Sequence, residues 1–207
     1  MPITPLARLV SDKQTVVALD RATAIAQARG IQVLNDSTEV GRIVQQYPQL
    51  LPYQNDNSSL STVAPSYIWD SITTTPQIRF FALGTTGFVL AAGNQLLVDL
   101  KVFCDNAHDV QIDIFDVTVG DLFTTITPAG NLTDGNLDPN TGVTDDIPYN
   151  WLNILYYTNT SIAVPDSRDG DTFQAVLSFQ AVNYNISPPG TPNPAALAFV
   201  ADIWMAS

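Results

Sequence analysis

Lysine, glutamate, histidine and cysteine are scarce in this sequence. Of its 207 residues only two are lysine and only one is glutamate, whereas nineteen are aspartate. Glutamate and lysine are the usual surface residues of helices, while aspartate belongs to turns and to the flanks of strands. The shortage therefore argues against a mainly helical protein.

Basic residues are nearly missing from the second half of the chain. Residues 1–101 carry seven acids and seven bases, but residues 102–207 carry thirteen aspartates and a single base, Arg168. The formal net charge of −12 therefore comes entirely from the second half. Such a surface repels phosphate groups, so we expect no direct nucleic-acid partner.

We expect neither a disulfide within the chain nor a membrane helix. Cys104 is the only cysteine, so it has no partner within the chain. The longest apolar run, residues 195–201, is far shorter than the ~20 residues that a membrane helix needs. A basic region followed by an apolar stretch is missing from the start, which predicts synthesis in the cytoplasm without a signal peptide.

The first of two short helices is predicted between residues 11 and 30. Ser11 to Gln14 resembles a capping box, and Gly30 stands where a helix commonly stops. At 100° per residue the residues on its apolar face would be Ala18, Leu19, Ala22, Ile25 and Ala26.

A second helix is predicted from Asp36 or Ser37, with Glu39 in its first turn, to a point before Pro48. Its apolar positions, spaced i, i+3, i+4 and i+7, are Val40, Ile43, Val44 and Tyr47. We expect these four to contact a neighbouring chain, because a short amphipathic helix has apolar surface to bury. Residues 1–65 are thus predicted to be a helical arm and an extended, proline-containing linker.

From residue 66 onward the apolar period changes to two, which predicts an acidic β-domain over residues 66–207. Strands are predicted at 77–83, 87–91, 96–104, 110–117, 121–127, 150–157, 161–164, 172–185 and 195–205. Many short strands separated by turns favour an antiparallel β-sandwich of the jelly-roll kind.

The clearest pair of strands is predicted to be a hairpin that turns at residues 105–109. Lys101 would then face Asp113 across the outer side. The inward positions of the two strands would be Leu96, Val98, Leu100, Val102, Cys104, Val110, Ile112 and Ile114.

A catalytic set is not recognisable. His108 is the only histidine, and the hairpin places it on a solvated turn tip while Cys104 points into the core, which separates a possible nucleophile from its base. Asp113 and Asp116 differ in parity and so face opposite sides of their strand, where solvated acids are the expected state. We therefore predict no enzyme, no catalytic residue and no cofactor.

The sequence leaves open whether one loop binds calcium. Asp134 and Asp145 are twelve positions apart when counted inclusively, with oxygen-bearing residues at alternate positions after Asp134. The loop 134–146 departs from the EF-hand pattern, because Pro139 stands where glycine is required and aspartate replaces the final glutamate. Asp166, Asp169 and Asp171 form a second acidic loop. Asx-rich turns give such runs without any metal, and no metal site is predicted.

The organisation of the chain resembles that of virion structural proteins, such as phage capsid, cement or decoration subunits. The resemblance rests on the arm (11–30 and 37–47), the extended segment 52–65 and the acidic, strand-rich remainder. It implies a non-catalytic assembly protein that binds other protein subunits, is located in the virion and is made in the host cytoplasm. The arm is neutral, unlike the basic arms of coat proteins that package RNA.

Two other classes remain open. A carbohydrate-binding or adhesin-type sandwich would use aromatic platforms, but Trp69, Trp151 and Trp204 lie within strand patterns where core packing is the default. An enzyme would need a catalytic set that the sequence does not display. Whether the arm packs on its own domain or on a neighbour is undecided at this level.

Overall fold

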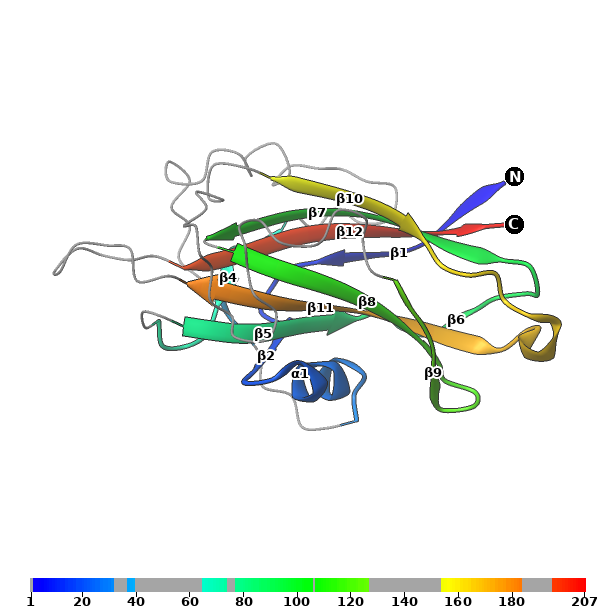
Figure 1. Cartoon of the computed structure of the whole chain (residues 1–207), viewed down its shortest axis with the longest axis horizontal. Helices are drawn as coiled ribbons and strands as arrows, with labels where there is room; N and C mark the ends of the chain where they lie inside the picture. The colour runs from blue at the N-terminus through cyan, green and yellow to red at the C-terminus, as the bar shows by residue number, and fades with distance from the viewer. Residues whose placement is uncertain are drawn as a thin grey trace, which may run out of the picture.

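The computed structural model describes residues 2–31, 37–39, 65–73, 77–105, 107–126, 154–183 and 195–207. Within these residues the chain forms two antiparallel β-sheets that face each other across one apolar core (Figure 1). The expected mainly-β sandwich is confirmed at this level, and its assignment as a jelly roll stays a prediction.

Sheet A is built around β12. Its strands, in spatial order, are β10 (Leu155–Thr160), β7 (Gln95–Asp105), β12 (Ala196–Ala206), β4 (Ile68–Trp69) and β3 (Thr38–Glu39), and β1 (Ile3–Val10) also pairs with β12. Sheet B is built around β11. Its strands are β2 (Val16–Ala18), β5 (Gln77–Gly84), β11 (Thr172–Asn183), β8 (Ala107–Asp116) and β9 (Asp121–Ile126), and β6 (Phe88–Val89) also pairs with β11.

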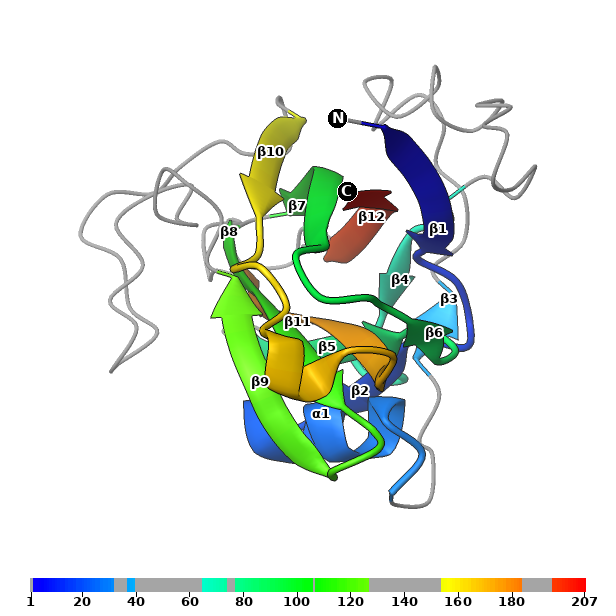
Figure 2. The ribbon, with the colours of Figure 1, turned by 90° about the vertical axis from the view of Figure 1, so that its right-hand side faces the viewer.

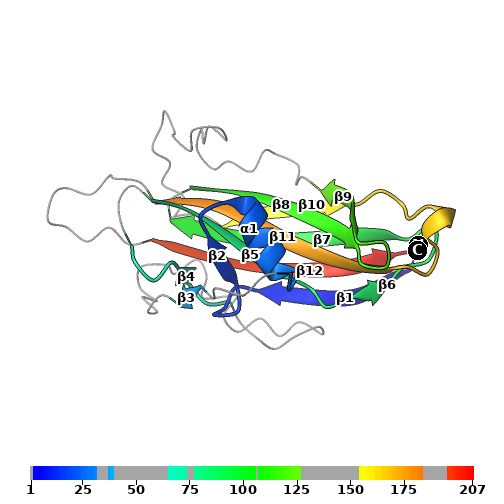
Figure 3. The same ribbon diagram turned by 90° about the horizontal axis from the view of Figure 1, so that it is seen from below.

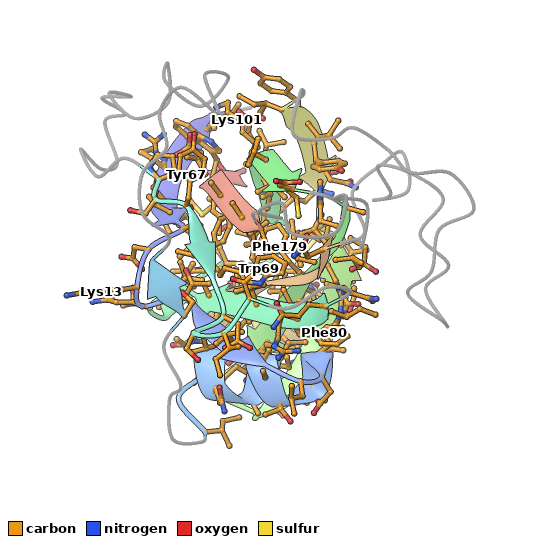
Figure 4. All side chains as sticks on the ribbon, turned by 90° about the vertical axis from the view of Figure 1, so that its left-hand side faces the viewer. Lys13, Tyr67, Trp69, Phe80, Lys101 and Phe179 are labelled. Carbon is orange, nitrogen blue, oxygen red and sulfur yellow. The ribbon has the colours of Figure 1, made fainter. Side chains whose placement is uncertain are left out.

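Aromatic side chains join the two sheets at the centre. Phe179 of β11 stacks on Phe199 of β12 with ring centroids 4.6 Å apart, and both are almost fully buried. Trp69 packs against Phe81, and its indole Nε1 donates to the Gln77 side chain at 2.8 Å. Figure 4 shows Trp69 and Phe179 between the layers. The prediction that Trp69 is a core residue is confirmed.

The predicted inward rows are confirmed, but the predicted hairpin is wrong. All eight inward residues, from Leu96 to Ile114, are at most 1% exposed. However, β7 pairs with β10 and β12, whereas β8 pairs with β11 and β9. The chain thus crosses from sheet A to sheet B between Asp105 and Ala107. Because both sheets face the same core, the inward pattern is identical for a hairpin and for such a crossing.

The crossing also removes the expected charge pair of Lys101 with Asp113. Lys101 instead lies 3.5 Å from Asp99 on its own strand. Asp113 is only 2% exposed on the outer side of sheet B, where both its oxygens accept from Gln111 and one accepts from Thr125. It is a buried, hydrogen-bonded acid rather than a solvated one.

The N-terminal segment begins with a strand that the sequence analysis did not predict. Ile3–Val10 forms β1 and pairs antiparallel with β12, with a bulge between Pro5 and Ala7. Proline cannot donate to a sheet ladder, so it is confined to edges and bulges. Among the described residues β1 pairs with β12 alone, which explains why Pro5 is tolerated.

The first predicted helix exists but is shorter than expected. Helix α1 spans Arg21–Ala28, and its N-cap is Asp20, whose carboxylate accepts from the Thr23 amide at 2.8 Å. The predicted capping box is a turn instead, because the Asp12 side chain accepts from the Gln14 amide. The residues after it form strand β2. The predicted stop is confirmed, since Gly30 follows the helix with φ of +74°.

The buried face of α1 also differs from the predicted one, because the helix starts later. Leu19 is 76% exposed and Ala22 is exposed, while Ala24 is fully buried. The helix face toward the sheet carries small side chains, so the helix lies close to the sheet. A Cβ at Gly84 of β5 would meet the Ala28 carbonyl oxygen at 2.7 Å. Figure 3 shows α1 lying across the outer side of sheet B. This helix therefore docks on its own domain.

The predicted second helix is wrong at its start. Thr38–Glu39 is strand β3 and pairs with β4. Residues 40–64 lie outside the described residues. The division of the chain at residue 65 stays a prediction, although β1, β2 and β3 each contribute to one of the two sheets.

The remaining strand predictions hold with three exceptions, the first of which is that the strand predicted at 87–91 is reduced to the two residues of β6. Residues 161–164 form a loop, in which the amides of Ser161 and Val164 donate to the carbonyl oxygens of Leu96 and Asn94. The strand predicted at 150–157 is confirmed only at its C-terminal end, where β10 begins at Leu155, and residues 150–153 lie outside the described residues. No helix in the described part of the chain is long and apolar enough to cross a membrane.

Candidate functional site

The residues predicted to form an interface cannot be placed. Val40, Ile43, Val44 and Tyr47 all lie outside the described residues, as do Trp151 and the loop 134–146 with its possible calcium ligands. In the described part of the chain no group of three His, Cys, Asp or Glu side chains is arranged to hold a metal ion.

His108 is buried, contrary to the expectation of a solvated turn tip. It is the second residue of β8, faces inward and is 1% exposed. Its Nε2 lies 3.1 Å from the hydroxyl of Tyr157 on β10, so the pair links the two sheets through the core. Burial lowers the pKa of His108 to about 3, so the ring is neutral at pH 7. Cys104 is buried as predicted, and its thiol lies 3.2 Å from the Ala107 carbonyl oxygen.

Four charged side chains form a network at one end of the sandwich. Arg168 donates to Asp116 at 2.7 Å and to both oxygens of Asp121 at 2.9 and 3.0 Å. Asp116 also accepts from the Val119 amide at 3.0 Å, and its side chain is fully buried. Asp171 is hydrogen-bonded to Asp116. The network ties the β8–β9 turn to the loop before β11 (Figure 2).

The two hydrogen-bonded carboxyl groups of this network have different acidities. Burial raises the pKa of Asp171, and the neighbouring charge of Asp116 raises it further. Burial also acts to raise the pKa of Asp116, but the hydrogen bonds from Val119 and Arg168 outweigh burial and lower it. Asp171 therefore keeps its proton to higher pH than Asp116. Because Asp116 is already bonded within the protein, its evident role is to brace this end.

The braced end carries apolar side chains on its surface. Val117 and Val119 on the β8–β9 turn are 50% and 62% exposed, Leu122 at the start of β9 is 50% exposed, and Val89 of β6 is 61% exposed. Val89 lies opposite Thr172, whose carbonyl oxygen accepts from the Val117 amide, so the two segments are neighbours. We call these four residues the apolar end cluster.

A second feature is a row of polar side chains across the outer face of sheet A, in which the Arg8 and Asp202 side chains are buried and Asp99 is partly exposed. The registers of three strand pairs place Thr158, Asp99, Asp202 and Arg8 side by side on β10, β7, β12 and β1. We call these four residues the charged row. Thr158 donates to Asp99 at 3.2 Å, and Arg8 lies 3.6 Å from Asp202. Lys101, two positions after Asp99 on β7, lies at the outer side of the sheet with its Nζ 3.5 Å from Asp99 (Figure 4).

Aromatic residues stand on both sides of the charged row. Tyr156 precedes Thr158 by two positions on β10 and is 61% exposed. Trp204 follows Asp202 by two positions on β12 and is partly exposed. Its inward neighbour Ile203 is fully buried, so the expectation that Trp204 belongs to the core is corrected. Nothing in the sequence indicates the register that brings these positions together across four strands.

Comparisons with known proteins identify no family. No family model and no curated protein matches the chain. Among solved structures it is similar to a carbohydrate-binding module, TmCBM61, in complex with β-1,4-galactotriose, with TM-score 0.37 and 9% identity over 99% of this chain and 88% of that one.

Two viral proteins are also similar to the chain. One is the enzymatically active domain of bacteriophage CBA120 tailspike protein 4, with TM-score 0.37 and 10% identity over 99% of this chain but only 19% of that one. The other is VP2 of an infectious bursal disease virus subviral particle, with TM-score 0.32 and 8% identity over 98% of this chain and 54% of that one. With TM-scores below 0.5, these likenesses carry no argument about function.

Proposed function

We propose that this chain is a non-catalytic structural subunit of a virus particle, a capsid, cement or decoration protein that binds neighbouring protein subunits. The observation that carries the proposal is the apolar end cluster. Its four side chains are each at least half exposed, although they sit on segments held by backbone hydrogen bonds. Exposed apolar patches on a rigid element mark protein–protein contact sites.

The network beneath the cluster supports a docking role. Asp116 is fully buried and bound by Arg168, which fixes the β8–β9 turn before any partner arrives. A surface that is already ordered loses little conformational entropy when it binds. The rim of the cluster is acidic, with the Asp121 side chain 49% exposed and Asp166 and Asp169 exposed nearby. The partner surface should therefore be apolar at its centre and basic at its rim.

The virion context rests on the organisation of the sequence. The acidic, lysine-poor sandwich and the segment that carries Val40, Ile43, Val44 and Tyr47 resemble phage structural subunits. We propose that this segment makes a second contact with a neighbouring chain. The described helix α1 is not that contact, because it packs on its own sheet.

The test is a pair of substitutions at the apolar end cluster. Val117→Ser with Val119→Ser should leave the fold intact, because both side chains are exposed, but should abolish association. Native mass by light scattering across a concentration series measures self-association. Mass spectrometry of particles purified from the host that carries the gene detects association with other proteins.

A matched control lies away from this cluster. Ile72, in the turn between β4 and β5, is 67% exposed, so Ile72→Ser removes a similar exposed apolar side chain and should not alter association. The proposal fails if the unaltered chain is monomeric at every concentration and is absent from particles. It also fails if the Val117 and Val119 variant assembles like the unaltered protein.

A further inference from the structure

Arg29 is an unpaired cation in a chain that carries twenty acids against eight bases. Of these bases only Arg42 lies outside the described residues. Five of the others form ion pairs with aspartates, namely Arg8, Arg21, Arg79, Lys101 and Arg168. Within the described part of the chain, Lys13 and Arg29 have no carboxylate partner. An arginine without a partner is unexpected where acids are in such excess.

The Arg29 guanidinium is held in place on the outer side of sheet B. It lies over the ring of Phe115, with its Cζ 3.7 Å from the ring centroid, which is a cation–π distance. Its Nε is buried and has no hydrogen-bond partner among the described residues, whereas its two Nη groups reach solvent. A planar guanidinium fixed in this way offers paired N–H donors to a carboxylate that comes from outside the chain.

Asp166 is an unpaired anion near the same end of the sandwich. It is the first residue of the short helix η3 (Asp166–Arg168) and is exposed. Its carboxylate has no hydrogen bond or ion pair with any other described residue. The neighbouring acids are already bonded, because Asp169 accepts from the Ala92 amide at 2.9 Å and Asp121 accepts from Arg168. Asp166 is therefore able to pair with a cation from another molecule.

Arg29 and Asp166 lie on opposite sides of the apolar end cluster. Phe115, on which Arg29 stacks, is paired with Leu122 of the cluster. Asp166 belongs to the loop that is hydrogen-bonded to the residue after Val89 of the cluster. In Figures 1 and 3 the β8–β9 turn lies between α1 and this loop, which is drawn in yellow-orange. The surface thus presents a cation, an apolar centre and an anion in that order.

We propose that a second copy of this chain binds the apolar end cluster across a two-fold axis, with Arg29 of each copy paired to Asp166 of the partner subunit. A two-fold contact brings the same surface of both copies together, so that surface must be complementary to itself. Rotation by half a turn about the centre of the cluster exchanges its two sides. It therefore places the cation of one copy near the anion of the other. The inference rests on the proposed function, because it names the partner for that same contact.

Long-range repulsion between two acidic copies does not prevent this contact. Each copy carries a net charge of −12, but at physiological ionic strength charges more than about 8 Å apart are largely screened. The apolar centre and the two ion pairs act at contact distance, where screening is weak. A polyanion would also pair with Arg29, but it would meet the exposed carboxylates of Asp166 and Asp169 on the other side of the cluster.

Reversal of either charge tests the pairing. Arg29→Glu places like charges opposite each other at both ends of the two-fold contact, and Asp166→Arg does the same. Each variant alone should weaken self-association of the full chain about tenfold, because two attractive contacts become repulsive. Sedimentation equilibrium at physiological ionic strength measures the dissociation constant. Arg29→Gln removes the charge without reversing it and should give a smaller loss.

Restoration of association distinguishes this pairing from a general effect of charge. An equimolar mixture of the Arg29→Glu and Asp166→Arg chains should associate about as tightly as the unaltered protein, because both contacts again join opposite charges. The double variant should associate with itself for the same reason. Lys13→Glu is the matched control, since Lys13 is an unpaired and exposed cation in the turn before β2. Its reversal changes the net charge as much as Arg29→Glu does, and it should leave association unchanged.

Three results would overturn the proposal. The first is a single reversal that associates like the unaltered chain, and the second is a mixture or double variant that stays as weak as the single reversals. Because Asp166 is exposed and unbonded, Asp166→Arg tests the contact even where Arg29→Glu fails to fold. The third is an unaltered chain that is monomeric at every concentration but present in particles. That result would leave the assembly role intact with a different protein as the partner, so the two failures are distinguishable.

Discussion

The two sheets share one core but differ on their outer faces. On sheet B, helix α1 packs Ala24 against a buried cluster that includes Ala82 and Val176, so the chain itself closes this face. On sheet A, the face near β10 keeps Tyr156 61% exposed beside the charged row. The closed face stabilises the fold. The outer face of sheet A is buried at Asp202 and Phe103 and is exposed at the β10 end, so substitutions at its buried and exposed positions should differ in their cost to stability.

The largest effect is expected inside the sandwich, where both sheets meet. Leu100 of β7 is fully buried, and Leu100→Ala should lower the free energy of unfolding by about 2–5 kcal/mol. Leu97 lies on the same strand but faces outward and is partly exposed, so Leu97→Ala should cost clearly less. Urea unfolding of both variants measures the difference, and equal losses would contradict the assigned faces.

The comparison of Leu97 with Leu100 also shows what the sequence can predict. Alternation along a strand identifies which side chains face the core, and this was correct for β7 and β8. It does not identify the partner strand, because Val110 is buried equally well in a hairpin or in the opposite sheet. The wrong hairpin in turn misplaced His108, which the crossing buries at the start of β8.

The candidate sites were less predictable than the core. Arg8 and Thr158 are 150 positions apart in the chain, and only the pairing of β1, β12, β7 and β10 brings them into one row. Strand β1 was missed because Pro2 and Pro5 argue against a strand. The apolar end cluster gave no periodic signal, since its residues belong to a turn and to the ends of strands.

The next effect concerns the closed face of sheet B. Ala24 of α1 is fully buried against the sheet, so Ala24→Leu overpacks the contact and should destabilise the protein by about 1–3 kcal/mol. Ala22 is exposed on the same helix, and Ala22→Leu should have almost no effect. Thermal unfolding of the two variants checks this prediction. If Ala24→Leu left the unfolding temperature unchanged, α1 would not close the face.

A smaller effect follows from the histidine that links the sheets. The pKa of His108 is about 3 in the folded protein and near 6.5 when the chain is unfolded, so the unfolded state binds the additional proton between these values. The contribution of His108 to the free energy of unfolding is therefore fully present above pH 6.5. It is lost as the pH falls, and the free energy of unfolding is about 1.4 kcal/mol lower at pH 5.5.

Because His108 is the only histidine, its ring can be titrated directly by NMR. We expect the ring signals to stay at their neutral positions down to pH 4.5. His108→Gln should reduce the loss of stability between pH 7.5 and 5.5 by about the same 1.4 kcal/mol. An NMR midpoint near 6.5 would show instead that the ring is solvated.

The smallest effect is expected on the outer face of sheet A, between two like charges. Asp99 and Asp202 lie directly opposite each other on β7 and β12, an arrangement that destabilises a sheet by tenths of a kcal/mol. A double-mutant cycle with Asp99→Asn and Asp202→Asn should therefore give a repulsive coupling of roughly 0.2–1 kcal/mol. Because Asp99 is partly exposed, the coupling should shrink as salt is added. A zero or attractive coupling would mean that Lys101 and Arg8 already hold the two acids as separate neutral pairs.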